Sequence, residues 1–240
     1  MKKFFVGIIF ILLAGAVVLG VNHFEQPDSN EDAKESNLDK DFSNAFEMTK
    51  VLAEKGNTTS QFELGVMYDG GEGVAQDFKE AAKWYRKAGE KGHVSSQYNL
   101  GVMYQDGEGV ARDCKEAAKW YQKAAEQGHA VAQNNLGVLY YEGEGIARDH
   151  KKAFKWFRKA AEQGNIASQF QLAYMYDEGE GVAQDFKEAL KWYHKAAEQG
   201  YALSQLALGT MYEQGRGVPK DKNKAAKWYR KAIEQRSVQN

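Results

Sequence analysis

The 240-residue chain contains a single cysteine, so an internal disulfide framework is excluded. Its charges are almost balanced, with 32 Lys and Arg against 33 Asp and Glu and a net charge of −1. The strongly basic footprint of a nucleic-acid-binding protein is therefore missing, and no nucleic-acid partner is expected. The five histidines show neither the H-E-x-x-H spacing nor a supporting cysteine cluster. We interpret them as solvated surface residues and predict no metal or cofactor site.

Catalytic motifs are missing as well. The chain has no S-x-x-K, no G-x-S-x-G and no P-loop. Its GxG turns lack the third glycine of a dinucleotide fingerprint, and the aspartate that begins the following helix would repel a phosphate. We therefore predict that the protein is not an enzyme and binds no small-molecule substrate.

What the chain does contain is one motif repeated without insertion or deletion. Its five tryptophans lie 36 residues apart, and a period between 20 and 50 residues is typical of a stacked repeat array. The second copy reads VSSQYNLGVMYQDGEGVARDCKEAAKWYQKAAEQGH. The five predicted repeats span residues 58–93, 94–129, 130–165, 166–201 and 202–237.

Each repeat predicts two helices separated by a glycine-rich turn. In the second repeat, Leu100 and Tyr104 belong to an apolar face with spacings of three and four residues, which marks the first helix. Gly107 can take the left-handed conformation that ends a helix, and Asp113 is a typical N-cap for the second. The small residue Gly101 is expected to let the two helices approach closely. Because neither helix can bury its apolar face alone, neighbouring repeats should stack around a continuous core.

These residues form the pattern AxxQxxLGxxYxxGxGVxxDxxKAxxWYxKAAxxG, which resembles the Sel1-like repeat, a relative of the tetratricopeptide repeat (TPR). The resemblance covers residues 58–237. It implies an all-α fold, a right-handed α-solenoid of helix-turn-helix repeats in a TPR-like superhelix with about eleven helices. It also implies a non-enzymatic scaffold or adaptor that binds a protein or peptide.

The chain begins with the apolar segment MKKFFVGIIFILLAGAVVLGV, residues 1–21. Lys2 and Lys3 form a basic start, residues 4–21 are apolar, and an A-x-A cleavage pattern ends at Ala16. This predicts a bacterial export signal that is either cleaved or retained as an inner-membrane anchor. Because the lysines stay inside, both outcomes place the repeats in the periplasm or in the secreted fraction.

Two further segments precede the first repeat. Residues 22–40 are acidic and show no apolar period, which predicts a flexible linker. Residues 41–57 align with the second half of a repeat, although Met48 stands where tryptophan would. A terminal half-repeat of this kind is predicted to cap the N-terminal end of the array.

The resemblance also suggests where a partner would bind. In TPR arrays the first helix of each repeat lines the concave surface. Matching the LGxxY motif to those arrays assigns the same surface here to positions 2, 5, 9, 12 and 13, counted from the first residue of each repeat. Positions 5 and 9 vary and include aromatic residues, whereas positions 12 and 13 carry acids but no Lys or Arg. We therefore predict an apolar groove with an acidic rim, suited to an extended or helical segment with basic residues. The predicted groove consists of Phe62, Val66, Asp69, Tyr98, Asp106, Asn134, Tyr141, Glu142, Phe170, Tyr174, Asp177, Glu178 and Glu213.

Two alternative functions stay open. Exported, cysteine-rich proteins of the resembling family have been described as β-lactamases, so an envelope hydrolase is the main alternative, although this chain lacks their paired cysteines. A structural protein associated with peptidoglycan is the second. Cys114 is interpreted as a partly exposed residue without a chemical role, because its repeat position holds several different side chains.

Overall fold

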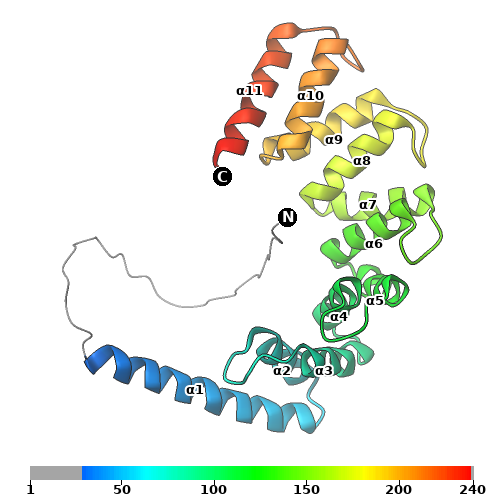
Figure 1. The fold of residues 1–240 in the computed structure, drawn as a ribbon. Helices are drawn as coiled ribbons and strands as arrows, with labels where there is room; N and C mark the ends of the chain where they lie inside the picture. The colour runs from blue at the N-terminus through cyan, green and yellow to red at the C-terminus, as the bar shows by residue number, and fades with distance from the viewer. Residues whose placement is uncertain (1–28, 239–240) are drawn as a thin grey trace. The chain divides into compact units, whose positions relative to one another are not determined.

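The computed structural model describes the backbone of residues 29–238 and the side chains of residues 41–234. The predicted export signal and the start of the predicted linker lie outside the described residues. The chain divides into two units, Met1–Leu38 and Asp39–Asn240. The described residues form eleven helices and no strand, beginning with α1 (Ser29–Glu54), which starts in the first unit and ends in the second (Figure 1).

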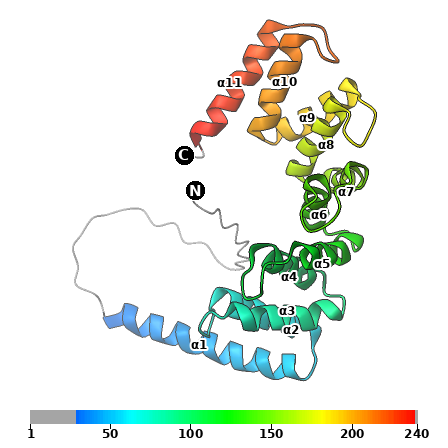
Figure 2. The ribbon, with the colours of Figure 1, turned by 45° about the vertical axis from the view of Figure 1, so that its right-hand side comes forward.

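The ten helices after α1 form five pairs, one for each predicted repeat. The first and second helices of a pair lie side by side in both views (Figures 1 and 2). Each second helix except the last also contacts the first helix of the next pair, so the pairs stack in chain order. This arrangement confirms the predicted all-α solenoid. The first helices are α2 (Thr58–Gly70), α4 (Val94–Asp106), α6 (Ala130–Glu142), α8 (Ile166–Glu178) and α10 (Ala202–Gln214), and the second helices are α3 (Phe78–Glu90), α5 (Cys114–Glu126), α7 (His150–Glu162), α9 (Phe186–Glu198) and α11 (Lys222–Val238).

The limits of the helices follow from caps at fixed repeat positions. The Asp113 carboxylate accepts hydrogen bonds from the backbone N–H groups of Lys115 at 3.0 Å and Glu116 at 3.1 Å, which begins α5. Gly107 ends α4 in the left-handed conformation with φ of 77°. Its N–H donates to the carbonyl oxygen of Met103 at 2.8 Å. Both predicted helix limits are confirmed.

The first helices begin at caps that the sequence pattern did not reveal. Nδ1 of His93 accepts a hydrogen bond from the N–H of Ser96 at 3.3 Å, and Nδ1 of His129 accepts one from Ala132 at 3.1 Å. Asn165 performs the same task at the start of α8. The two histidines are half-buried. They are therefore N-caps and not the solvated surface residues that were expected.

Contact within a pair depends on the small residue predicted for that purpose. A Cβ atom added at Gly101 would lie 2.6 Å from the ring of Tyr121, closer than van der Waals contact allows. The same contact recurs between Gly65 and Tyr85. The second helix therefore presses its tyrosine ring against the bare backbone of the first, and a larger residue would force the pair apart.

Contact between successive pairs combines an aromatic ring with a buried amide. Trp120 packs beside Gly89 of the preceding repeat, where an added Cβ atom would lie 3.2 Å from the ring. The Lys123 ammonium lies 4.0 Å from the centroid of the same indole. Gln97 is 4% exposed, and its Nε2 donates to the Gly89 carbonyl oxygen at 2.9 Å. Its Oε1 accepts from Nε2 of Gln127 at 2.7 Å, so every polar atom of this buried side chain takes part in the junction.

The second glycine of each GxG turn also serves the junction. Gly109 has φ of 68° and lies against the backbone of Phe78, the first residue of the preceding second helix. A Cβ atom at this position would collide with the Phe78 carbonyl group. The turn therefore needs glycine both for its left-handed conformation and for a close approach between backbones. This contact supplies a structural role for the GxG motif.

Residues 29–40 form the first part of α1 and not the flexible linker predicted for residues 22–40. They contain no glycine or proline, and their acidic residues near the helix start are favoured by the helix dipole. Farther along α1, Phe46 and Ala53 are 6% and 1% exposed, and they cluster with Leu64 and Trp84 of the first repeat. The packed end of the helix can support an upstream extension that has no apolar face of its own.

Candidate functional site: the surface of the first helices

The thirteen residues of the predicted groove lie on the first helices of the five pairs, which are α2, α4, α6, α8 and α10. At position 5, the Tyr98 ring stacks on His129 with 4.7 Å between centroids, and it lies 6.0 Å from the ring of Tyr121. The Phe62 ring packs against the equivalent His93 in a tilted arrangement, with 4.5 Å between centroids. These rings are half-buried between their own second helix and the cap of the next first helix. Each ring thus strengthens a repeat junction and leaves one part accessible to a partner.

The other members at position 5 also reach the next repeat. Oδ1 of Asn134 accepts a hydrogen bond from the Ser168 hydroxyl at 2.8 Å. The Phe170 ring lies 5.4 Å from the ring of Tyr201, which begins α10. Substitutions at position 5 will therefore lower stability as well as any affinity, so they are poor probes of binding.

Position 9 supplies side chains at the edge of the core. Val66 and Tyr174 are both half-buried. Val66 packs against the cluster around Leu100 and Trp120, and Tyr174 packs against the cluster around Trp192. Apolar contact area is thus available on α2 and α8 beside the position 5 rings.

Position 12 is partly used inside the pair. The Tyr85 hydroxyl donates to Oδ2 of Asp69 at 3.2 Å, and the Tyr229 hydroxyl donates to Oε2 of Glu213 at 2.9 Å. Burial raises the pKa of Asp69, the Tyr85 hydrogen bond lowers it, and the nearby Glu108 carboxylate raises it again. Asp69 and Glu213 therefore hold the second helix of their own pair in place, although Glu213 is also exposed to solvent.

Asp177 departs from the predicted acidic rim. Its carboxylate is buried, and Oδ2 lies 3.1 Å from Nη2 of Arg216. Burial raises the pKa of Asp177, while the Arg216 guanidinium lowers it. The glutamate of the GEG turn is replaced by Arg216 in the fifth repeat alone. This change from glutamate to arginine is the sequence feature that could have revealed the ion pair, because it places a cation opposite position 12 of the preceding repeat.

Tyr141 is likewise engaged at a junction. Its hydroxyl donates to Oε2 of Glu180 at 2.6 Å, and its ring stacks on His150 with 4.8 Å between centroids. Nδ1 of His150 lies 4.0 Å from the same Glu180 oxygen. These three side chains join the third repeat to the fourth, so Tyr141 contributes little free hydrogen-bonding capacity to a partner.

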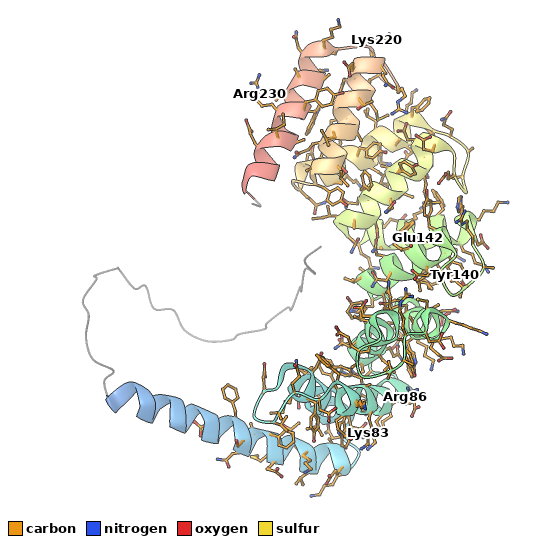
Figure 3. All side chains as sticks on the ribbon, viewed as in Figure 1. Lys83, Arg86, Tyr140, Glu142, Lys220 and Arg230 are labelled. Carbon is orange, nitrogen blue, oxygen red and sulfur yellow. The ribbon has the colours of Figure 1, made fainter. Side chains whose placement is uncertain are left out.

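The acids at position 13 face solvent, as Glu213 does at position 12. Asp106, Glu142 and Glu178 are exposed at the C-terminal ends of three first helices, and Figure 3 labels Glu142 at the end of α6. A cation was overlooked nearby, since Arg148 donates from Nη2 to the Glu142 carbonyl oxygen at 3.2 Å. The rim is therefore acidic at position 13, with basic side chains in the adjoining turns.

The single cysteine of the chain lies at the start of α5. Cys114 is 9% exposed and not partly exposed as expected, and its thiol donates to Oε1 of Glu144 at 3.4 Å. Burial and the Glu144 carboxylate raise the pKa of this thiol, which favours its protonated form over the nucleophilic thiolate. Within the described part of the chain, no group of three or more His, Cys, Asp or Glu side chains is placed to hold a metal. No helix in that same part has the length and hydropathy needed to cross a membrane.

Comparison with known proteins identifies the repeat. The family model described as Sel1 repeat matches residues 58–93, 94–129, 130–165, 166–201 and 202–237. These limits are the ones predicted from the tryptophan period. A comparison with curated protein sequences found no match.

Among the solved structures that resemble the chain, two share more than 30% of its sequence over most of its length. A Sel1 repeat protein from Oxalobacter formigenes shares 34% sequence identity with a TM-score of 0.77, over 87% of this chain and 85% of that one. A protective antigen of uropathogenic Escherichia coli strains, described as displaying an SLR fold, shares 44% identity with a TM-score of 0.76. That similarity covers 79% of this chain, which spans only 40% of the E. coli protein.

Proposed function

Because the chain belongs to the Sel1 repeat family, we propose that it is a non-enzymatic scaffold or adaptor that binds a protein or peptide in the bacterial cell envelope. The observation that carries the proposal is the exposure of Asp106, Glu142 and Glu178 at one repeat position on successive first helices. Half-buried apolar side chains at positions 5 and 9 lie on the same helices. Together they offer apolar contact beside evenly repeated negative charge.

The proposed partner is an extended or helical segment with basic residues. Apolar anchors would fill the spaces beside positions 5 and 9, and Lys or Arg would face the acids at position 13. Exposed charges of this kind mainly increase the association rate and make it sensitive to salt, whereas the buried anchors determine how long the complex lasts. Asp177 is not part of the proposed rim, because Arg216 already neutralises it.

A triple charge reversal tests the assignment of the surface. The variant Asp106→Lys, Glu142→Lys, Glu178→Lys changes exposed residues only, so it should fold normally. The matched control reverses three exposed acids on the second helices, Glu90→Lys, Glu126→Lys and Glu162→Lys. Proteins captured from envelope extract by each form would be compared by quantitative mass spectrometry. Loss of a captured basic protein in the first variant alone supports the proposal, and loss in the control alone assigns binding to the second helices.

The envelope location rests on residues 1–21, whose basic start and apolar run are typical of an export signal. A fusion of residues 1–40 to alkaline phosphatase should be active in a bacterial host, because that enzyme needs export to fold. The same fusion without residues 4–16 is the control and should be inactive. Equal activity of the two fusions, or none in either, would contradict export.

A further inference from the structure

The second helix of the third repeat, α7, carries more positive charge than the neighbouring second helices α5 and α9. It holds five lysine and arginine residues against one glutamate, whereas α5 and α9 each hold three lysines against two glutamates. Most of the difference arises at one repeat position, because Lys152 stands where α5 has Glu116 and α9 has Glu188. Lys224 makes the same replacement in α11. Both α7 and α11 therefore have no acid in the first turn.

The replaced acid normally pairs with a lysine one turn farther along the helix. In α9, Oε1 of Glu188 lies 3.1 Å from the ammonium group of Lys191. Lys155 is the equivalent lysine of α7, and it has no ion pair among the described side chains. Lys151 and Lys159 lie four residues to either side of it, and all three are exposed. Residues spaced by four lie on one face of a helix, and we refer to these three lysines as the α7 lysine face.

The tryptophan beside this face is more accessible than those of the neighbouring repeats. Trp120 and Trp192 are 5% and 7% exposed, whereas Trp156 is half-buried. The Lys159 ammonium lies 4.4 Å from the centroid of the Trp156 indole, so the ring adjoins the α7 lysine face. Trp228 of α11 is half-buried as well. The replaced acid and the accessible indole thus occur together in two second helices, and the other three have neither.

We propose that the α7 lysine face and Trp156 bind a bilayer surface that contains anionic phospholipid. Ammonium groups are attracted to lipid phosphates without a fixed bonding geometry, so a row of lysines needs no shaped pocket. An indole suits the headgroup level of a bilayer, because its ring is apolar and its N–H is polar. Protein interfaces, by contrast, are depleted in lysine, which argues against an acidic protein segment as the partner.

The α7 lysine face lies on a second helix, whereas the proposed partner-binding surface lies on the first helices. A membrane bound at α7 would use none of the residues of that other surface. The two proposals rest on different side chains, so either can fail without the other.

Tryptophan fluorescence of the full chain in the presence of vesicles tests the contact. All five tryptophans lie in the repeats, so residues 1–21 add nothing to the signal even if they insert into the bilayer. Vesicles of phosphatidylglycerol and phosphatidylcholine, brominated close to the headgroup, should quench the native chain because bromine quenches an indole that touches the bilayer. Vesicles without phosphatidylglycerol should quench it much less, and added salt should reduce the difference. Trp156→Phe should remove the part of the quenching that depends on phosphatidylglycerol, whereas the matched control Trp228→Phe should keep it.

Charge removal tests the lysines, with a matched set on the preceding second helix. The test variant is Lys151→Gln, Lys155→Gln, Lys159→Gln. The control changes the exposed lysines at the same repeat positions of α5, Lys115→Gln, Lys119→Gln, Lys123→Gln. Each lysine beside an anionic bilayer changes binding roughly fivefold, so the test variant should need at least about tenfold more lipid for half-maximal quenching. The control should shift that amount less than about threefold.

A single substitution tests the role of the missing acid. Lys152→Glu restores the residue type of α5 and α9 beside Lys155, and it should weaken lipid-dependent quenching about tenfold while circular dichroism shows native helix content. Equal effects of the two triple variants, or quenching lost in Trp228→Phe and kept in Trp156→Phe, overturn the assignment to α7. A native chain that shows no quenching by phosphatidylglycerol vesicles also overturns the proposal, and binding of soluble polyglutamate by that chain would assign the lysines to an acidic protein segment.

Discussion

Nε2 of Gln97 donates to the carbonyl oxygen of Gly89 at 2.9 Å, and this bond ties the second repeat to the end of the first. The same bond recurs with Gln133 and the Ala125 carbonyl oxygen at 3.0 Å. In each case the glutamine is buried, and its amide is a second donor to a carbonyl oxygen at a helix end that also accepts the backbone N–H of Gly92 or Gly128. A polar contact therefore repeats at successive junctions inside an otherwise apolar core.

Gln97→Met should destabilise the array by about 1–3 kcal/mol, because at nearly constant volume it removes two hydrogen bonds of a buried amide, one to the Gly89 carbonyl oxygen and one from Gln127. The control is Gln122→Met on an exposed face of α5, where the change should stay within about 0.5 kcal/mol. Urea unfolding followed by circular dichroism measures both. Equal losses would show that the junction amide contributes nothing beyond its volume.

Gly109→Ala and Gly128→Ala should separate backbone strain from the repeat junction. Both glycines have positive φ, 68° and 92°. An added Cβ atom at Gly128 meets nothing within 4 Å, whereas at Gly109 it collides with Phe78. Gly128→Ala should therefore cost about 1–2 kcal/mol for the left-handed conformation alone. Gly109→Ala should cost a further 1–3 kcal/mol or so for the displaced junction, and similar melting temperatures for the two variants would contradict this account.

The capping histidines should make stability depend on pH. Burial lowers the pKa of His93 and His129 below the ordinary value of 6.5, so the unfolded chain binds more protons than the native one. Their contribution is complete above pH 6.5 and declines as the pH falls below that value. His129→Asn keeps a capping oxygen, as Asn165 does in α8, but removes the titration. Unfolding free energies between pH 7.5 and 5 should fall less steeply in this variant, and an unchanged slope would contradict the prediction.

Arg216→Gln should destabilise the last junction by about 3 kcal/mol, because it leaves the buried Asp177 carboxylate without a countercharge. The loss should shrink as the pH falls, since protonation removes the buried charge. The double variant Asp177→Asn, Arg216→Gln should recover most of the stability, because two amides can bond to each other without a charge. Chemical denaturation of the single and double variants measures the coupling, and additive losses would argue against a direct pair.

The sequence by itself determined the repeat limits, the number of helices and the ends of most of them. The period of the tryptophans and the caps at Asp113 and Gly107 are local signals, because a cap bonds to N–H or C=O groups within four residues of itself. Gly101 was also readable, since a small residue on an apolar helix face indicates close packing whatever the partner. These local interactions were sufficient to predict the solenoid from the sequence.

Only the tertiary structure decided which polar residues are used inside the array. The sequence predicts that Asp177 faces outward, but the turn of the next repeat places Arg216 against its carboxylate. The role of Gln97 likewise depends on its hydrogen bond to Gly89 of the preceding repeat. His129 acts as a cap because its ring, which stacks against Tyr98, is oriented so that Nδ1 accepts the N–H of Ala132. These roles depend on neighbours across a junction, and the cost of burying a polar group is settled only when those neighbours are in place.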